Sequence, residues 1–251
     1  MCSKSITINQ RENTMSNKVW TTIVMREDNL KVFGLSFPNK FDYPEFYALE
    51  KNKQLTDEEN IKWKQMNGDF LEMHKPYKAF KTIDPTIIPN VLYAHNVSKQ
   101  IKFPSFCRTY DGDILINEEC ANLLKQFRLG DTAMYPLSFF DIDLNEPVND
   151  KTYYLLNIAE WRHYLLPEFG SEKIRKKSYN NESYQVFGLY VDYYKDGAIA
   201  ITEQAVNCNL DLWHDPALTS SIFVSDELKK ALDEAGMGTD WLFYECQIIE
   251  S

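Results

Sequence analysis

The chain has little of what marks fibrous, disordered or disulfide-stapled proteins. Its 251 residues include only 9 glycines and 10 prolines, which argues against a linker-rich array or a disordered chain. The five cysteines are Cys2, Cys107, Cys120, Cys208 and Cys246, and no two form a CxxC pair. An odd, scattered set fits neither a disulfide framework nor a zinc site. With 44% hydrophobic residues, the chain can build a sizeable core, as one large domain or two small ones.

Long apolar runs and an excess of basic charge are also missing. No run is long enough to span a bilayer, and residues 1–18 lack the apolar centre of a signal peptide, so we expect a cytoplasmic protein without membrane contact. A formal net charge of −10 argues against a nucleic-acid partner, because phosphate binding needs a basic surface. The acidic balance fits a basic protein partner or solubility alone. We interpret the one basic run, residues 172–177, as a solvated loop or helix end.

Residues with catalytic chemistry are few and form no known motif. The sequence has no P-loop, GxGxxG or GxSxG pattern. None of the four histidines has metal-ligand spacing: His74, His95, His163 and His214. The acidic pairs Asp111/Asp113 and Asp141/Asp143 could bind a cation or act as an acid–base pair, but we favour a turn for the first and a polar strand face for the second. We therefore expect no catalytic residue, no metal and no cofactor.

What the sequence does contain is a regular alternation of strands and capped helices. β-rich segments at 19–25, 29–37, 151–161, 182–194 and 197–206 predict strands. Asp196-Gly197 predicts a hairpin between the last two of these. Thr56 followed by Glu59 predicts a capping box at the start of a helix, which Asn67-Gly68 could split. These features predict an α+β fold, with a largely antiparallel sheet and capped helices packed on it.

One local pattern occurs twice. Residues 114–130 and 221–238 each run from an apolar strand through a polar cap, Asn117 or Ser225, into an amphipathic helix followed by glycine. Side-chain oxygen at the cap, acids in the first turn and glycine at the end are the usual signals of a helix. Nothing between the copies repeats, so we interpret them as one packing solution used twice. The second copy predicts a strand–helix–strand unit at the C-terminus.

Prolines divide the chain into regions. Pro76, Pro85, Pro89 and Pro104 cluster among short apolar runs, which favours a connecting segment there. We expect a disordered tail at 1–14, with Met15 as a second possible start, an N-terminal α+β region at 15–105, and a C-terminal α+β domain at 106–251.

The C-terminal region resembles a known family. The segment "VSDELKKALDEAG", Val224 to Gly236, and the strand "YYLLNIAEW", Tyr153 to Trp161, are similar to the bacterial immunity proteins of polymorphic toxin systems, over roughly residues 114–249. The resemblance implies a non-enzymatic inhibitor that binds the catalytic domain of a cognate toxin, one to one, and occludes its active site. The family provides no catalytic residues to transfer, and its toxin-contacting residues vary.

Tyrosines and acids gather in the second half of the chain, a composition typical of an interaction surface, although tyrosines on a hairpin could equally face the core. The candidate partner-binding residues are Asp192, Tyr193, Tyr194, Asp196, Trp213, His214 and Asp215. Two other functions stay open. The chain could be a small hydrolase that reverses toxin damage, with His163 or His214 beside an aspartate, or a scaffold or oligomerisation module.

Overall fold

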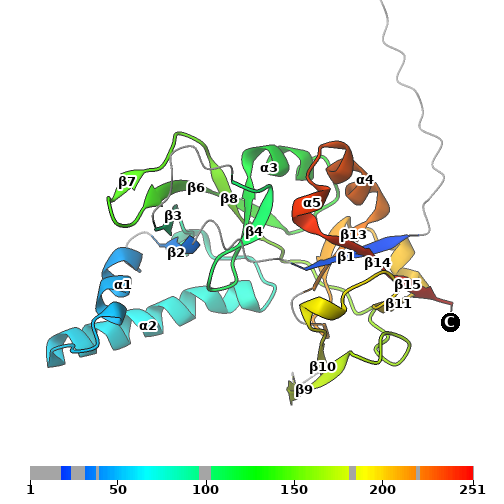
Figure 1. The fold of residues 1–251 in the computed structure, drawn as a ribbon, viewed down its shortest axis with the longest axis horizontal. Coiled ribbons are helices and arrows are strands. Elements are labelled where there is room, and N and C mark those ends of the chain that lie inside the picture. Colours follow the sequence, from blue (N-terminus) through cyan, green and yellow to red (C-terminus); the bar gives the residue numbers. More distant parts are fainter. Residues whose placement is uncertain are drawn as a thin grey trace, which may run out of the picture.

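The computed structural model describes residues 18–23, 32–37, 40–95, 103–180, 185–218 and 221–250. It confirms the predicted class: helices and mostly antiparallel strands combine in an α+β fold (Figure 1). The expected tail at 1–14 lies outside the described residues. Within the described ranges, no helix combines the length and apolarity needed to cross a bilayer.

The larger sheet has seven strands. Along its edge-to-edge path these are β2 (Val32–Ser36), β3 (Val91–Ala94), β6 (Ala133–Asp141), β8 (Tyr153–Asn157), β5 (Ile114–Asn117) and β4 (Phe106–Arg108), and β7 (Glu146–Pro147) pairs with β6. Only β3 and β6 run parallel among these pairs. The helices α1 (Tyr43–Lys51) and α2 (Asp57–Lys78) lie beside this sheet at one end of the molecule (Figure 1).

The second sheet has four strands in the order β12 (Leu212–His214), β13 (Ser221–Ser225), β1 (Val19–Ile23) and β14 (Phe243–Glu245). Two smaller pairs accompany it. These are β9 (Arg175–Asn180) with β10 (Gln185–Gly188), and β11 (Ala200–Thr202) with β15 (Gln247–Ile249). Short 3-10 turns lie at Pro85–Ile87 (η1), Val191–Tyr193 (η2) and Glu203–Asn207 (η3).

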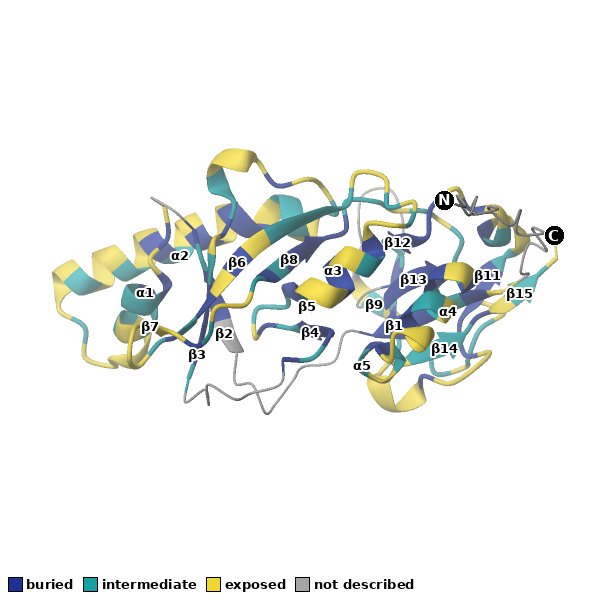
Figure 2. Ribbon diagram, turned by 90° about the horizontal axis from the view of Figure 1, so that it is seen from above, coloured by how far each residue is buried: buried dark blue, intermediate teal, exposed yellow. Residues whose placement is uncertain are grey.

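Three helices join the sheets through a shared core. They are α3 (Glu118–Leu124), α4 (Asp226–Glu234) and α5 (Gly238–Trp241). Leu124, Leu228 and Trp241 are buried there against strand residues from both sheets. A second core lies between α1, α2 and the larger sheet, and a third surrounds Trp213 behind the smaller sheet. Figure 2 shows the largely buried strands β8 and β13 in the body of the molecule, whereas the far end of α2, at the left of the view, is largely exposed.

Both main sheets draw strands from either side of residue 105. β1 lies between β13 and β14, with Val19 opposite Ser225, and β3 pairs with β6. The expected division at 105/106 therefore does not coincide with a boundary between sheets.

The local helix predictions are confirmed in atomic detail. Thr56 and Glu59 form a reciprocal capping box at the start of α2. Asn117 Oδ1 accepts the amide of Cys120 at 2.9 Å, and Ser225 Oγ accepts that of Leu228 at 3.2 Å. These bonds satisfy amides that the first turn of a helix leaves without a partner.

The predicted hairpin is wrong. The Asp196-Gly197 turn exists, with Gly197 at φ 74°, but it joins no hairpin, because β10 pairs with β9 and β11 pairs with β15. Instead Asp196 Oδ1 and the Gly197 amide bond to the backbone of Glu245 at 2.8 Å each. The split that Asn67-Gly68 could introduce does not occur: α2 continues through Gly68 and even through Pro76 in its last turn. Pro76 stands too close to the helix end to interrupt it.

Candidate functional site

The four expected partner residues near η2 lie in two environments. Asp192 and Tyr193 belong to η2 and are exposed, as is Asp196 in the following turn. Tyr194 is buried instead, and its hydroxyl lies 2.5 Å from Ser221 Oγ on β13. Its role is to attach η2 to the smaller sheet, so it is not available at the surface.

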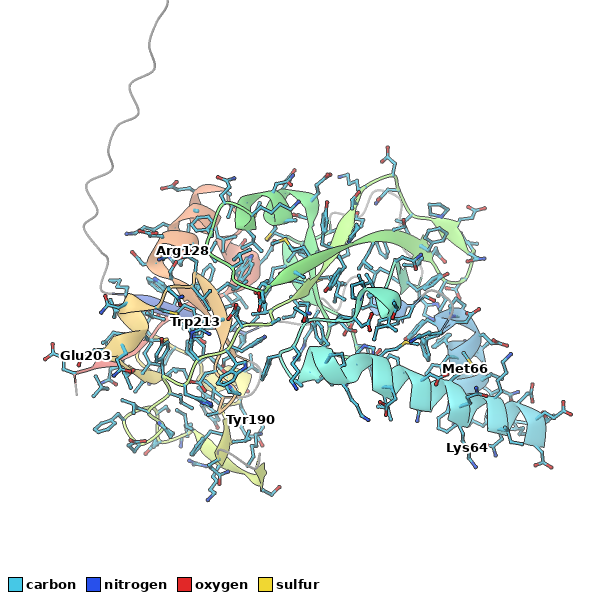
Figure 3. The ribbon with its side chains drawn as sticks, turned by 180° about the vertical axis from the view of Figure 1, so that it is seen from behind. Lys64, Met66, Arg128, Tyr190, Glu203 and Trp213 are labelled. Carbon is cyan, nitrogen blue, oxygen red and sulfur yellow. The ribbon has the colours of Figure 1, made fainter. Side chains whose placement is uncertain are left out.

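Trp213 and Asp215 are interior residues. The Trp213 side chain is 1% exposed and stacks on Phe223, with ring centroids 6.0 Å apart; Figure 3 shows it within the fold. Asp215 is also 1% exposed. Its carboxylate accepts the amides of Tyr164, Leu165 and Ala217 at 2.8–2.9 Å. It therefore holds two loops together and presents no free oxygen to a partner.

An exposed aromatic cluster lies on and next to η2. Tyr190 is 68% exposed and Tyr193 is 44% exposed, with the exposed Val191 between them, and Figure 3 shows Tyr190 at the periphery of the molecule. The ammonium of Lys177 lies 5.7 Å from the centre of the Tyr190 ring, and that of Lys173 lies 5.9 Å from Tyr193. Both distances suit cation–π contacts. We call Tyr190, Val191, Tyr193, Lys173 and Lys177 the tyrosine–lysine surface.

Sequence reasoning identified only part of this surface. Tyr193 was expected there, but the lysines belong to the basic run at 172–177, which we interpreted as a solvated loop or helix end. In the structure this run leads into and forms part of β9, whose pairing with β10 brings it beside η2. The sequence signal that could have revealed this surface is the presence of the one basic run shortly before the tyrosines, with a strand pair between them.

A separate cleft of about 270 Å³ lies between the two main sheets. Its polar lining comes from the end of α2, from β4 and the turn after it, from β8 and from β12: Tyr77, Lys78, Arg108, Asp111, Asn157 and His214. Tyr77 fixes this arrangement, because its hydroxyl donates to the carbonyl of Leu156 at 3.2 Å and accepts the amide of Ile114 at 2.7 Å.

Two groups in the cleft have displaced pKa values. Burial, reinforced by the charge of Asp113, raises the pKa of Asp111 to about 6. Burial lowers the pKa of His214 to about 4, against an opposing hydrogen bond from its ring to the carbonyl of Ser221. Phe80 packs on the His214 ring, with centroids 4.3 Å apart, and has the unusual φ of 55°. Displaced pKa values and a strained residue beside one cleft are typical of a functional site.

The first acidic pair forms the expected turn but also a buried ion pair. Gly112 has φ 96°, and the Thr109 amide donates to the Asp113 carbonyl at 2.9 Å. Asp113 turns inward to His74, with Nε2 and Oδ1 3.1 Å apart. No sequence spacing links these two residues, since they belong to different elements and meet only through the fold.

The remaining candidates have structural surroundings. Asp141 ends β6 and accepts the amides of Asp143 and Leu144, so the pair forms a turn and not the expected strand face. Asp143 lies 2.6 Å from His95 Nδ1. His163 Nδ1 lies 3.8 Å from Asp215 Oδ1. In the described part of the chain, no three His, Cys, Asp or Glu side chains gather as metal ligands.

Comparison with known proteins adds no assignment: no protein-family model matches the chain, and no curated protein matches it. The resemblance to immunity proteins remains a prediction from the residues quoted above.

Proposed function

We propose that the chain is a cytoplasmic immunity protein, which binds the catalytic domain of a cognate toxin, one to one, and covers the toxin's active site. The observation that carries this proposal is the tyrosine–lysine surface. Large aromatic side chains exposed together are the usual anchors of protein interfaces. Tyr190 and Tyr193 also lose little conformational freedom on binding, because a tyrosine has only two side-chain torsions.

The fold of the C-terminal segment supports the resemblance on which the proposal also rests. The segment from Val224 to Gly236 forms the end of β13 and the Ser225-capped helix α4, and α5 and the strand β14 follow it. Leu228 and Leu232 of this segment are fully buried. The two quoted segments thus belong to the scaffold of the fold, and the proposed contact residues lie between them in the sequence. That separation suits a family in which contacts vary while the scaffold is kept.

Charge shapes the expected partner in two ways. The net charge of −10 would steer a basic toxin domain toward the protein from a distance. At close range, Lys177 requires acidic or carbonyl oxygens opposite it, because a buried ammonium without a partner is costly. Lys173 Nζ already lies 3.2 Å from Glu172 Oε1. Protection by occlusion needs a Kd of about 1 nM or below, about −12 kcal/mol.

The direct experiment is co-expression with the toxin domain encoded beside this gene. We expect the protein to restore growth and to co-purify with the toxin domain as a one-to-one complex, measured by light scattering. If co-expression does not restore growth and the purified proteins form no complex, the proposal is contradicted.

A hydrolase that reverses toxin damage is the second candidate, because His214 lines a cleft that also contains Asp111. Replacing His163 or His214 by alanine separates the two functions. Occlusion predicts that both variants bind the toxin domain and protect. A hydrolase predicts that one of them binds but fails to protect.

A further inference from the structure

Three charged side chains of the cleft have no hydrogen-bond or ion-pair partner in the part of the chain that the structure describes. Lys78, Arg108 and Asp111 line the cavity, and among the described residues none of these side chains makes a hydrogen bond or an ion pair. Lys78 does act on Asp111 through space, since its charge opposes the increase in the Asp111 pKa. The cavity therefore presents two cations and one carboxyl group whose hydrogen-bonding capacity is unused.

His214 adds a hydrogen-bond acceptor. Its Nδ1 lies 3.1 Å from the carbonyl oxygen of Ser221, and a carbonyl can only accept, so Nδ1 holds the proton of the neutral ring. Nε2 is then an acceptor, and it makes no hydrogen bond with a described residue. This nitrogen can receive an N–H from a bound molecule.

Apart from Tyr77 and Asn157, the rest of the lining is apolar. Ile114, Ile158, Ile222 and the Phe80 ring come from four different segments and form the cavity walls. At about 270 Å³ the cavity is smaller than the clefts that hold drug-sized ligands, about 300 Å³ and above. It suits a small metabolite with an apolar body.

We propose that this cleft binds a small zwitterion of the amino-acid class. Arg108 and Lys78 pair with its carboxylate, Asp111 and His214 Nε2 receive its ammonium group, and the isoleucines surround its apolar side chain. A simple anion fits less well, because it would face the Asp111 carboxylate, and an unpaired like charge disfavours a ligand. The site is independent of the tyrosine–lysine surface and of the proposed toxin.

The test uses the full chain, without any toxin, in calorimetric titrations near neutral pH with L-phenylalanine and L-leucine as probes. The amine-free analogue 3-phenylpropionate and the carboxylate-free analogue phenethylamine are the comparisons. We expect at least one amino acid to bind about tenfold tighter, or more, than either analogue. No saturable binding of either amino acid up to millimolar concentration, or equal binding of 3-phenylpropionate, would overturn the proposal.

Two substitutions identify the groups involved. Asp111→Asn should weaken amino-acid binding about tenfold or more. It should strengthen the binding of 3-phenylpropionate, because it removes both the partner of the ammonium and the negative charge that opposes a simple anion. Arg108→Met should weaken the binding of the amino acids and of 3-phenylpropionate, which all have a carboxylate, and leave the binding of phenethylamine unchanged. The matched control is Arg175→Met on β9, which is exposed and does not line the cleft. Neither test side chain makes a hydrogen bond in the described structure, so folding should survive, as circular dichroism will report. Folded variants that bind like the parent would contradict the assignment.

Discussion

The His74 side chain lies in the interior with an acceptor at each ring nitrogen. Nδ1 is 3.0 Å from the carbonyl of Phe70, and Nε2 is 3.1 Å from Asp113 Oδ1. Both contacts require a proton on the nitrogen, so this geometry favours the imidazolium. Burial alone lowers the pKa of His74, but the hydrogen bond and charge of Asp113 outweigh it, and the pKa is raised. The pair joins α2 to the turn before β5.

This pair predicts a pH-dependent loss of stability. His74→Ala leaves Asp113 buried without its cation and should cost about 3–5 kcal/mol in unfolding free energy. Because the folded-state pKa is raised, the stabilisation is complete below the unfolded pKa of about 6.5 and is lost as pH rises through the folded pKa. Urea unfolding at pH values of about 5.5 and 8.5 should therefore show a larger deficit at the lower pH.

The control for this prediction is His163→Ala, whose parent side chain is 46% exposed and should change stability by no more than about 0.5 kcal/mol. A His74→Ala deficit that stays constant or grows with pH would show that the pair is not ionic.

At the scale of elements, the effect of a glycine on helix stability can be tested separately from side-chain packing. The end of α4 has Gly236 at φ 73°, its amide bonded to Asp233 and that of Met237 bonded to Leu232. This pattern of two bonds is a Schellman motif. In contrast, Gly68 lies inside α2. A Cβ added at either glycine would meet nothing within 4 Å, so only the backbone conformation distinguishes them.

The two glycines therefore predict opposite effects of one substitution. Gly68→Ala should stabilise the protein by about 0.5–1 kcal/mol, because alanine favours a helix interior. Gly236→Ala should destabilise it by about 1–2 kcal/mol, because a side chain disfavours the left-handed conformation. Thermal melts of both variants measure the difference. Equal signs would show that packing, not backbone preference, controls these positions.

The Ser225 cap allows a second comparison. Ser225→Ala removes the oxygen that accepts the Leu228 amide and should cost about 1 kcal/mol. Ser225→Asn keeps an acceptor for the Leu228 amide and can still donate to the buried Asp211 carboxylate, which the Ser225 side chain contacts, so its melting temperature should stay near that of the parent. If both variants lose stability equally, the position matters for packing and not for capping.

Elements were predictable where their signals are local. The caps at Thr56, Asn117 and Ser225 each bond to an amide three residues away, so sequence spacing contains the whole interaction. Strand pairing was not predictable in this way. Val19 pairs with Ser225 across the length of the chain, and the Asp196-Gly197 turn predicted a hairpin that β15 and β9 prevent by pairing with β11 and β10.

The same distinction applies to the sites. Exposed tyrosines near η2 could be anticipated from composition, but the burial of Trp213 and Asp215 could not. Nor could the cleft, because Lys78, Arg108 and His214 come from elements that only the two sheets bring together.

At the scale of the whole molecule, strand β1 links the N-terminal part of the chain to the C-terminal sheet. It pairs with β13 on one side and β14 on the other. Residues 106–251 expressed alone would lack this strand and expose the edges of both neighbours, which favours aggregation. We expect the fragment to show no cooperative unfolding transition by circular dichroism, whereas the full chain does. A cooperative transition of the fragment would show that 106–251 is an independent domain.

Whether the tyrosine–lysine surface binds a toxin domain can be decided by measuring the affinity of a variant that lacks its aromatic side chains. The double variant Tyr190→Ala/Tyr193→Ala should weaken the Kd for the cognate toxin domain by about 30-fold or more, the effect of losing about 2 kcal/mol at an interface centre. Tyr110→Ala is the matched control, because Tyr110 is also 68% exposed but lies in the turn after β4, and it should leave the Kd unchanged. An unchanged Kd for the double variant, or an equal loss of affinity for Tyr110→Ala, would show that the tyrosine–lysine surface is not the binding surface.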